Sequence, residues 1–220
     1  MKKNIIKLLE RDIKDKHLSK HEFYQLWNEG KVSIEALRGY SQQYYKFVSE
    51  FPRFVSRVHS NTQYEEDRAH ILDNLNEEED KNLSHAELWL RFAEGIGVKR
   101  NKIDAEMLPE TKKMLNELRK LTSGNFLEGS AAILAYEAQI SEIAKLKMKG
   151  LRKHYNLRSK KALEFFSVHS KVDLEHQKTW KKIIEEHAKT KSQKASVRRA
   201  LNRSLDSMRL MLDGVLREYC

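Results

Sequence analysis

Three polar residues interrupt the apolar face of one predicted helix, and their types suit metal binding. The helix spans residues 159–188, and its core-facing positions, counted at alternating steps of three and four, read Ala162, Phe166, His169, Asp173, His176, Trp180 and Ile183. These steps place His169, Asp173 and His176 on one face over about 10 Å of helix. Burying ionisable groups without partners is costly, so the pattern predicts a site for one or two metal ions.

Other segments carry acids and a histidine at positions that could join this site. Glu137 is the lone acid on the core face of a predicted helix at 127–149. Glu78 and His85 are seven residues apart, and they share a face if the helix continues or can still converge if Ser84 starts a new one. The six residues suit two first-row divalent metals, iron or manganese, with positions left open for dioxygen or water. The alternative for each residue alone is a hydrogen-bonded core histidine or an ion-paired carboxylate.

Helices must position these residues, because the chain lacks the turn chemistry that sheets require. It has 8 Gly and 2 Pro in 220 residues, against an average of about 12% for the two types together. The predicted helices cover residues 19–28, 33–60, 63–79, 85–95, 110–122, 127–149, 159–188 and 193–218. Pro52 is expected to bend the second of these. The length suits one domain, so we expect residues 1–220 to form a single all-α bundle of about seven or eight helices.

Composition and charge also indicate the cellular compartment of the chain and the kinds of partner it could bind. A charged fraction of 34% beside a hydrophobic fraction of 40% argues against a membrane span. Lys7 and Glu10 interrupt any apolar leader, and the single Cys220 cannot form an internal disulfide, so a reducing cytoplasm is expected. The net charge is +10, with basic residues concentrated at 145–161 and 181–203. These stretches are interpreted as solvated helix faces, with a polyanion site as the alternative.

At these residues the sequence resembles the haem-oxygenase-like dimetal oxidases, and among them the CADD family, named for the chlamydial protein associating with death domains. The resemblance covers about residues 18 to 185. The matching motifs are His21-Glu-Phe-Tyr24-Gln-Leu-Trp27, Tyr40-Ser-Gln-Gln-Tyr44-Tyr45, Phe51-Pro52, His59-Ser60, Asp73-Asn-Leu75, Tyr136-Glu137-Ala-Gln-Ile140 and His169-x3-Asp173-x2-His176. The dimetal ligands that the resemblance implies are Glu78, His85, Glu137, His169, Asp173 and His176.

The resemblance implies an unusual reaction. CADD-type enzymes make para-aminobenzoate for folate synthesis by oxidising one of their own tyrosines, and a lysine supplies the amino group. Dioxygen is the co-substrate, and an external reductant is implied. The matching positions are Tyr24, Tyr40, Tyr136 and Lys147. Which tyrosine is consumed stays open at this point.

Two of these residues also have plain structural interpretations. Tyr24 could be an aromatic core residue. Lys147 lies between Lys145 and Lys149, an alternation that is ordinarily solvated. It is also ten residues after Glu137, which is about 15 Å along a helix, so reaching the metals would require a kinked or strongly tilted helix.

Several other functions remain as alternatives. One is a catalytic dimetal oxidase acting on a separate fatty acid or amino acid, and another is an oxidase like PQQ synthesis protein C, which the six metal-suited residues disfavour. A thiaminase is disfavoured because the only thiol is Cys220, and a haem oxygenase would leave the carboxylates unexplained. A basic helical module without chemistry would bind nucleic acid or a protein partner.

The C-terminal region departs from the family's best-known member. Residues 196–220 read as an amphipathic packing helix, and nothing in them indicates binding to death domains. We expect no membrane and no specific nucleic acid as partners, and a homodimer is compatible with the sequence.

Overall fold

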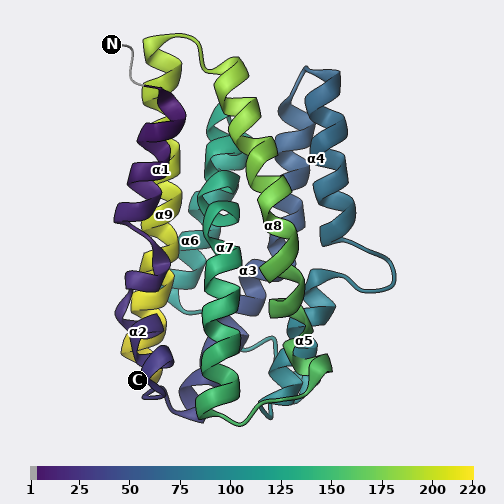
Figure 1. The fold of residues 1–220 in the computed structure, drawn as a ribbon, viewed down its shortest axis with the longest axis vertical. Coiled ribbons are helices and arrows are strands. Elements are labelled where there is room, and N and C mark those ends of the chain that lie inside the picture. Colours follow the sequence, from purple (N-terminus) through teal and green to yellow (C-terminus); the bar gives the residue numbers. More distant parts are fainter. Residues whose placement is uncertain (1–3) are drawn as a thin grey trace.

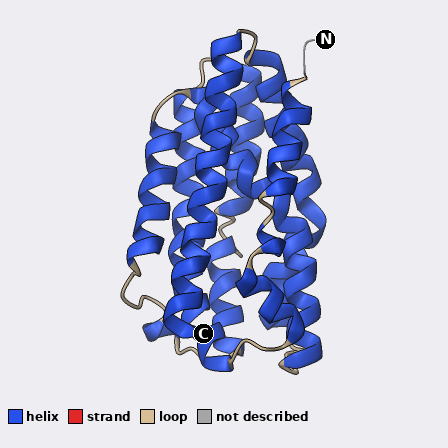
Figure 2. Ribbon diagram, turned by 90° about the vertical axis from the view of Figure 1, so that its left-hand side faces the viewer, coloured by secondary structure: helices blue, strands red, loops and turns tan. Residues whose placement is uncertain are grey.

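The protein is built of helices, as its low glycine and proline content predicts (Figure 2). A computed structural model describes residues 4–220, and for residues 171–175 it describes the helical backbone but not the side chains. The elements are α1 (Ile5–Asp15), η1 (Leu18–Lys20), α2 (Glu22–Glu29), α3 (Ile34–Asn61), α4 (Glu65–Glu78), α5 (His85–Gly95), η2 (Arg100–Lys102), α6 (Pro109–Ser123), α7 (Phe126–His154), α8 (Lys160–His187) and α9 (Lys191–Tyr219). Among the described residues, no helix combines the length and apolar character needed to cross a membrane.

The all-α bundle is confirmed, with one helix more than expected. Helix α1 was not predicted, although Ile5, Leu9 and Ile13 recur at helical spacing and are all buried. This face packs on α9 and α8, so the described chain has nine α-helices rather than seven or eight. Pro52 lies inside α3 without ending the helix, which continues to Asn61.

Helix α7 is the central element of the bundle (Figure 1). It packs against α8 on one side and α9 on the other, and it also contacts α2, α3 and α6. Ala131, Ala132 and Ala135 are fully or almost fully buried, and their small side chains let neighbouring helices approach closely. A polar residue in this part of α7 therefore lies in the interior of the molecule.

Helix α9 forms the C-terminal packing surface that the sequence predicts. Its buried seam consists of Val197, Leu201, Leu205, Met208, Leu212 and Val215. The capping box formed by Thr190 and Gln193 fixes the start of the helix.

Candidate metal centre and adjoining tyrosine cluster

Glu78, His85 and His169 form the first half of the candidate metal centre. Helix α4 ends at Glu78 and α5 begins at His85, so the helix does restart between them. His85 Nδ1 lies 2.7 Å from Glu78 Oε2. The His169 ring comes from α8 and lies 4.4 Å from the His85 ring, centroid to centroid. One potential ligand atom from each of the three lies within 4.8 Å of the others, and all three side chains are buried.

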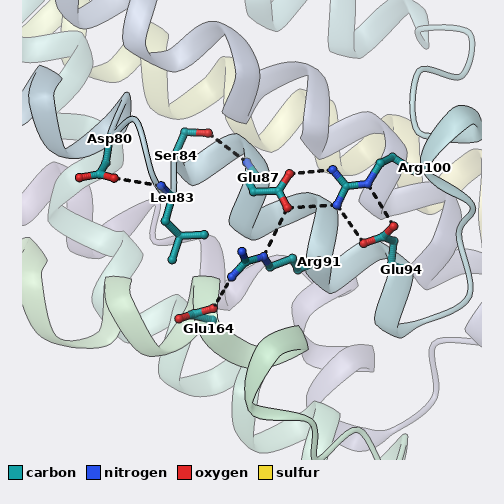
Figure 3. A network of polar contacts seen from close by, with 8 residues as sticks. All are labelled: Asp80, Leu83, Ser84, Glu87, Arg91, Glu94, Arg100 and Glu164. Carbon is teal, nitrogen blue, oxygen red and sulfur yellow. Dashed lines mark hydrogen bonds and ion pairs between the residues drawn. The ribbon is translucent and has the colours of Figure 1, made fainter.

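A polar network fixes the start of α5 and thereby its first residue (Figure 3). The Ser84 hydroxyl accepts a hydrogen bond from the Glu87 backbone N–H at 3.2 Å, which caps the helix. Asp80 accepts from the Leu83 N–H at 2.9 Å and holds the preceding turn. Arg100 binds Glu87 with a distance of 2.7 Å to Oε2. These contacts fix the loop before α5 and join the first turn of α5 to η2.

The second half of the centre lies between α7, α4 and α8. Glu137 is 3% exposed, accepts a hydrogen bond from the Asn74 amide at 3.2 Å, and has Oε2 3.9 Å from His176 Nδ1. The other ring nitrogen of His176 lies 3.3 Å from a carboxylate oxygen of Glu77. Five of the six predicted ligands are therefore gathered in one region. The side chain of the sixth, Asp173, lies outside the described residues.

The pKa shifts of the candidate ligands differ in direction: burial favours the neutral forms of Glu137 and His169, and a bound cation would favour the ionised carboxylate. Burial raises the pKa of Glu137 to about 7. Burial, and then the neighbouring His85, hold the pKa of His169 well below its usual value. His169 Nδ1 donates to the Phe165 carbonyl at 2.7 Å, which leaves Nε2 with a free lone pair. Burial lowers the pKa of His85, but the neighbouring carboxylates, Glu78 first and then Glu137 and Glu77, together more than offset this and the net shift is upward.

The residues present fit a dimetal centre. Neither Glu78 nor Glu137 is paired with a lysine or arginine among the described residues, although both carboxylates are buried. The Asn74 Oδ1 atom is also buried without a hydrogen-bond partner in that part of the chain. Divalent cations would compensate such a cluster, and its mixed nitrogen and oxygen donors suit iron or manganese.

A second buried cluster surrounds Lys147. This side chain has 0% exposure, and its Nζ donates a hydrogen bond to the Tyr40 hydroxyl at 2.6 Å. The Tyr40 hydroxyl is in turn 3.0 Å from that of Tyr24. Aromatic rings lie 4.5 to 6.0 Å from Nζ, and they belong to Tyr24, Trp27, Tyr40, Tyr44 and Trp89. Burial holds the pKa of Lys147 well below its usual value, so the amine tends toward its neutral form.

The interpretation of Lys147 as a solvated residue is wrong. Lys145 and Lys149 are exposed, but Lys147 points from α7 into the aromatic enclosure. The distance along the helix to Glu137 is no obstacle either. Helix α7 runs without interruption to His154, and Lys147 is near enough to His169 for its charge to contribute to the lowered pKa of that ring.

Tyr44 and Asn74 were missed as site residues. The Tyr44 hydroxyl donates to the Tyr136 hydroxyl at 3.1 Å, and the Tyr44 ring lies 5.3 Å from that of Tyr40. Tyr44 therefore connects the cluster around Lys147 to the residue that precedes Glu137. The signal was its position four residues after Tyr40, which places both on one helix face. Asn74 precedes Glu78 by the same spacing.

A small enclosed cavity borders the tyrosines. Its volume is about 10 Å³, and its lining is apolar. The lining residues are Leu18, Tyr24, Tyr44, Phe47, Met114, Tyr136, Met208, Met211 and Leu212. The space is enough for one water-sized molecule and for nothing much larger.

Comparisons with known proteins point to redox chemistry. A family model described as iron-containing redox enzyme matches residues 38–208. A 4-aminobenzoate synthase of Nitrosomonas europaea is 36% identical, and the match covers 94% of this chain and 89% of the relative. A 4-aminobenzoate synthase of Chlamydia trachomatis is 32% identical over 74% of this chain and 71% of the relative.

Solved structures share the fold at lower sequence identity. A TenA homologue from Pseudomonas syringae superposes with a TM-score of 0.85 at 20% identity, covering 97% of this chain and 93% of that one. A CADD-like protein of unknown function from Nostoc punctiforme gives a TM-score of 0.80 at 17% identity, covering 97% of both chains. At these identities the likeness concerns the fold alone.

Proposed function

This chain belongs to the haem-oxygenase-like family of iron-containing redox enzymes, in the CADD branch with the 4-aminobenzoate synthases, and we propose that it makes 4-aminobenzoate from its own side chains. It is an oxidoreductase. In this proposal Tyr24 supplies the ring and Lys147 supplies the nitrogen. The observation that carries the proposal is the buried Lys147 amine, which lies in hydrogen-bond contact with a tyrosine pair inside an aromatic enclosure.

The structure of 4-aminobenzoate sets what must happen to the two side chains. The Cα–Cβ bond of Tyr24 breaks, and Cβ is oxidised to the carboxyl carbon. At the opposite end of the ring a bond forms to Nζ of Lys147 and the phenolic oxygen leaves as water. The Cε–Nζ bond is oxidised to an imine, whose hydrolysis frees the nitrogen and leaves an aldehyde at Cε. Dioxygen is the oxidant in this proposal.

The surroundings favour Tyr24 over Tyr40 as the consumed residue. Tyr40 is packed among other rings, with Trp27 at 5.5 Å, Tyr44 at 5.3 Å and Trp89 at 6.0 Å between centroids. Tyr24 instead borders the apolar cavity on one side, which leaves space next to its ring. Lys147 Nζ lies 4.9 Å from the Tyr24 ring centroid, with the Tyr40 hydroxyl close to both groups.

The protein's own groups can move protons along this cluster. Burial raises the pKa values of Tyr24, Tyr40 and Tyr136, so the phenols stay protonated at neutral pH. A phenol that loses an electron becomes a strong acid, and its hydrogen-bonded neighbour then takes the proton. The neutral Lys147 amine has a lone pair for the same purpose and for bond formation to the ring.

The metals would be held by Glu78, His85, Glu137, His169, Asp173 and His176. When bound, they supply the reductive activation of dioxygen, which side chains alone do not perform. Iron, manganese or one of each fits these donors, and the electrons come from an external reductant. Tyr136 is adjacent to Glu137 in the chain. Its hydrogen bond with Tyr44 extends the series of phenol groups from the cluster around Lys147 toward the candidate metal centre.

The size of the internal space supports a side chain as substrate. An external fatty acid or amino acid would need a pocket of several hundred Å³. Among the described residues, the enclosed cavity beside the tyrosines has only about 10 Å³. A substrate that is already part of the chain needs no such pocket.

The test is to load the protein with iron and manganese, add a reductant and oxygen, and follow 4-aminobenzoate together with peptide masses. We expect at most one product per chain, with the loss of mass mapping to Tyr24 and to Lys147. Tyr24→Phe should give no product, while Tyr64→Phe, an exposed control, should behave as the parent. Many turnovers per chain, or product with both peptides unchanged, would sink the proposal.

Tyr44→Phe is expected to slow product formation by at least about tenfold, because it removes the hydroxyl that donates to Tyr136 while keeping the ring. Bound metal, measured by elemental analysis, should stay the same. The matched control is Tyr45→Phe, one residue later and only partly buried. Equal rates for the two variants would remove Tyr44 from the proton path.

A further inference from the structure

The two basic stretches of the sequence differ in the structure. In the stretch 181–203, Lys181, Lys182 and Arg198 each pair with an acid from another helix, at 2.8, 2.7 and 2.5 Å. These charges are largely neutralised within the protein. In the stretch 145–161, by contrast, most of the basic side chains have no acidic partner among the described residues.

Five exposed cations on and just after the C-terminal part of α7 form what we call the basic ridge. They are Lys145, Lys149, Arg152, Lys153 and Arg158. None of their side chains has a hydrogen bond or ion pair with another described residue. The ridge borders two shallow grooves of about 540 and 500 Å³, and Lys145, Lys149 and Lys153 line both. The one carboxylate among the groove residues is Glu142, so the local potential is strongly positive.

An aromatic residue lies directly beneath the basic ridge. At Gly150, which lines one groove, an added Cβ would be 2.7 Å from Trp27 Cδ1, so the indole is packed against the backbone of α7. The Trp27 ring lies 5.5 Å from that of Tyr40 and 6.4 Å from that of Tyr24. Glycine at 150 thus lets the buried Trp27 ring approach α7 as closely as the backbone permits, and this ring contacts the tyrosine cluster.

We propose that the basic ridge docks an acidic electron-carrier protein, and that electrons enter through Trp27. The inference rests on the proposed function, which needs an external reductant. At each encounter the reduced flavin or iron–sulfur group of the carrier gives up one electron, and the oxidised metal of the loaded protein receives it. The contiguous rings of Trp27, Tyr40 and Tyr44 shorten the gaps that the electron must cross.

A redox carrier fits this surface better than a nucleic acid or a membrane. Encounters between redox proteins use small, charge-steered contact areas, which five cations beside two shallow grooves can provide. Nucleic acids and anionic lipids would be attracted by the positive charge, but their binding would not require the buried Trp27 ring beneath it. The buried aromatic path is the feature that separates the candidates.

The test uses a strongly acidic flavodoxin as the probe, first with the metal-free chain and then with the metal-loaded chain. Lys145→Glu combined with Lys149→Glu should weaken binding by at least about tenfold. Raising the salt from about 50 to about 300 mM should weaken parent binding similarly, because the contact is electrostatic. The control is Lys191→Glu with Arg199→Glu, two exposed cations on α9 whose reversal changes the net charge equally. It should alter binding by less than about twofold.

The loaded chain gives a second measurement. Reduction of its metal by the reduced flavodoxin should slow by about tenfold in the ridge variant, while reduction by dithionite should not change. Equal effects of the ridge and control variants, or binding of RNA or anionic vesicles but not of flavodoxin at the ridge, would overturn the proposal. If the protein forms product with a chemical reductant but does not bind flavodoxin, the docking surface is wrong and the proposed function stands. If the ridge binds flavodoxin but the loaded protein forms no 4-aminobenzoate, the proposed function is wrong and the docking surface stands.

Discussion

Lys147→Met is expected to abolish 4-aminobenzoate formation and at the same time to stabilise the fold. Methionine matches the length of the lysine side chain, but it has no nitrogen to transfer, so product should fall below about one hundredth of the parent level. The enclosure of aromatic rings around Nζ suits an apolar side chain better than an amine. Removing a buried amine should raise the unfolding free energy by about 1 to 3 kcal/mol. Tyr40 keeps its hydrogen-bond partner Tyr24.

The same variant should change how stability depends on pH. Burial lowers the pKa of Lys147 in the folded state, while in the unfolded chain it stays near 10.5. Between these values the unfolded state binds one more proton, so this residue makes the parent less stable at low pH and its penalty disappears as pH rises to 10.5. Denaturant titrations of Lys147→Met at several pH values should show that the unfolding free energy rises less steeply with pH than in the parent, by up to about 1.4 kcal/mol per pH unit.

Lys149→Met provides the control, since that side chain is exposed on the same helix. It should retain the product yield and the pH slope of the parent. Incorporation of nitrogen from labelled lysine into 4-aminobenzoate gives an independent measurement with the parent chain. Product made by Lys147→Met, or product without the label, would show that the nitrogen comes from elsewhere.

Glu137→Gln is expected to remove the metal from the site and with it the product. The carboxylate is buried between the halves of the candidate centre, and glutamine keeps its shape and its contact with Asn74 but not its charge. Elemental analysis should fall from about two metals per chain to fewer than one. Glu142→Gln, exposed on the same helix, should retain the metal.

The metal-free form of this variant should be more stable than the parent above neutral pH. Burial raises the pKa of Glu137 from 4.5 to about 7, so between these values the folded parent binds the extra proton. Parent stability therefore falls as pH rises through this window, by about 3 kcal/mol in all. Thermal unfolding of both metal-free proteins from pH 4 to 8 measures this. Full metal content in Glu137→Gln would show that Glu137 is not a ligand.

Helical spacing was sufficient to predict that His169 and His176 share one buried face of α8. His169 and His176 are seven residues, or about two turns, apart on a single seam, so their shared face follows from the period of the helix. Glu78 and His85 converge because Ser84 caps a new helix, which the sequence also suggested. Helix α1 was not predicted, although Ile5, Leu9 and Ile13 recur at helical spacing and form its buried face.

The positions of Lys147 and its tyrosine neighbours depend on packing between helices that are distant in sequence. Lys145, Lys147 and Lys149 alternate, and spacing alone cannot say which of them faces inward. That is decided by α2 and α3, whose Trp27 and Tyr40 lie against this part of α7. Tyr44 shows the same limit, because its partner Tyr136 lies 92 residues away in the chain.

If Tyr24 is consumed as proposed, its burial has a consequence for the stability of the chain that remains. This ring is 1% exposed and is packed against Phe23, Trp27 and Tyr40. Excising it leaves a void in the middle of the core, equivalent to replacing a large residue by a very small one, which costs about 3 to 5 kcal/mol. Most domains have little more stability than that to lose. A spent chain would therefore unfold readily and be degraded by cellular proteases, so that its amino acids return to protein synthesis.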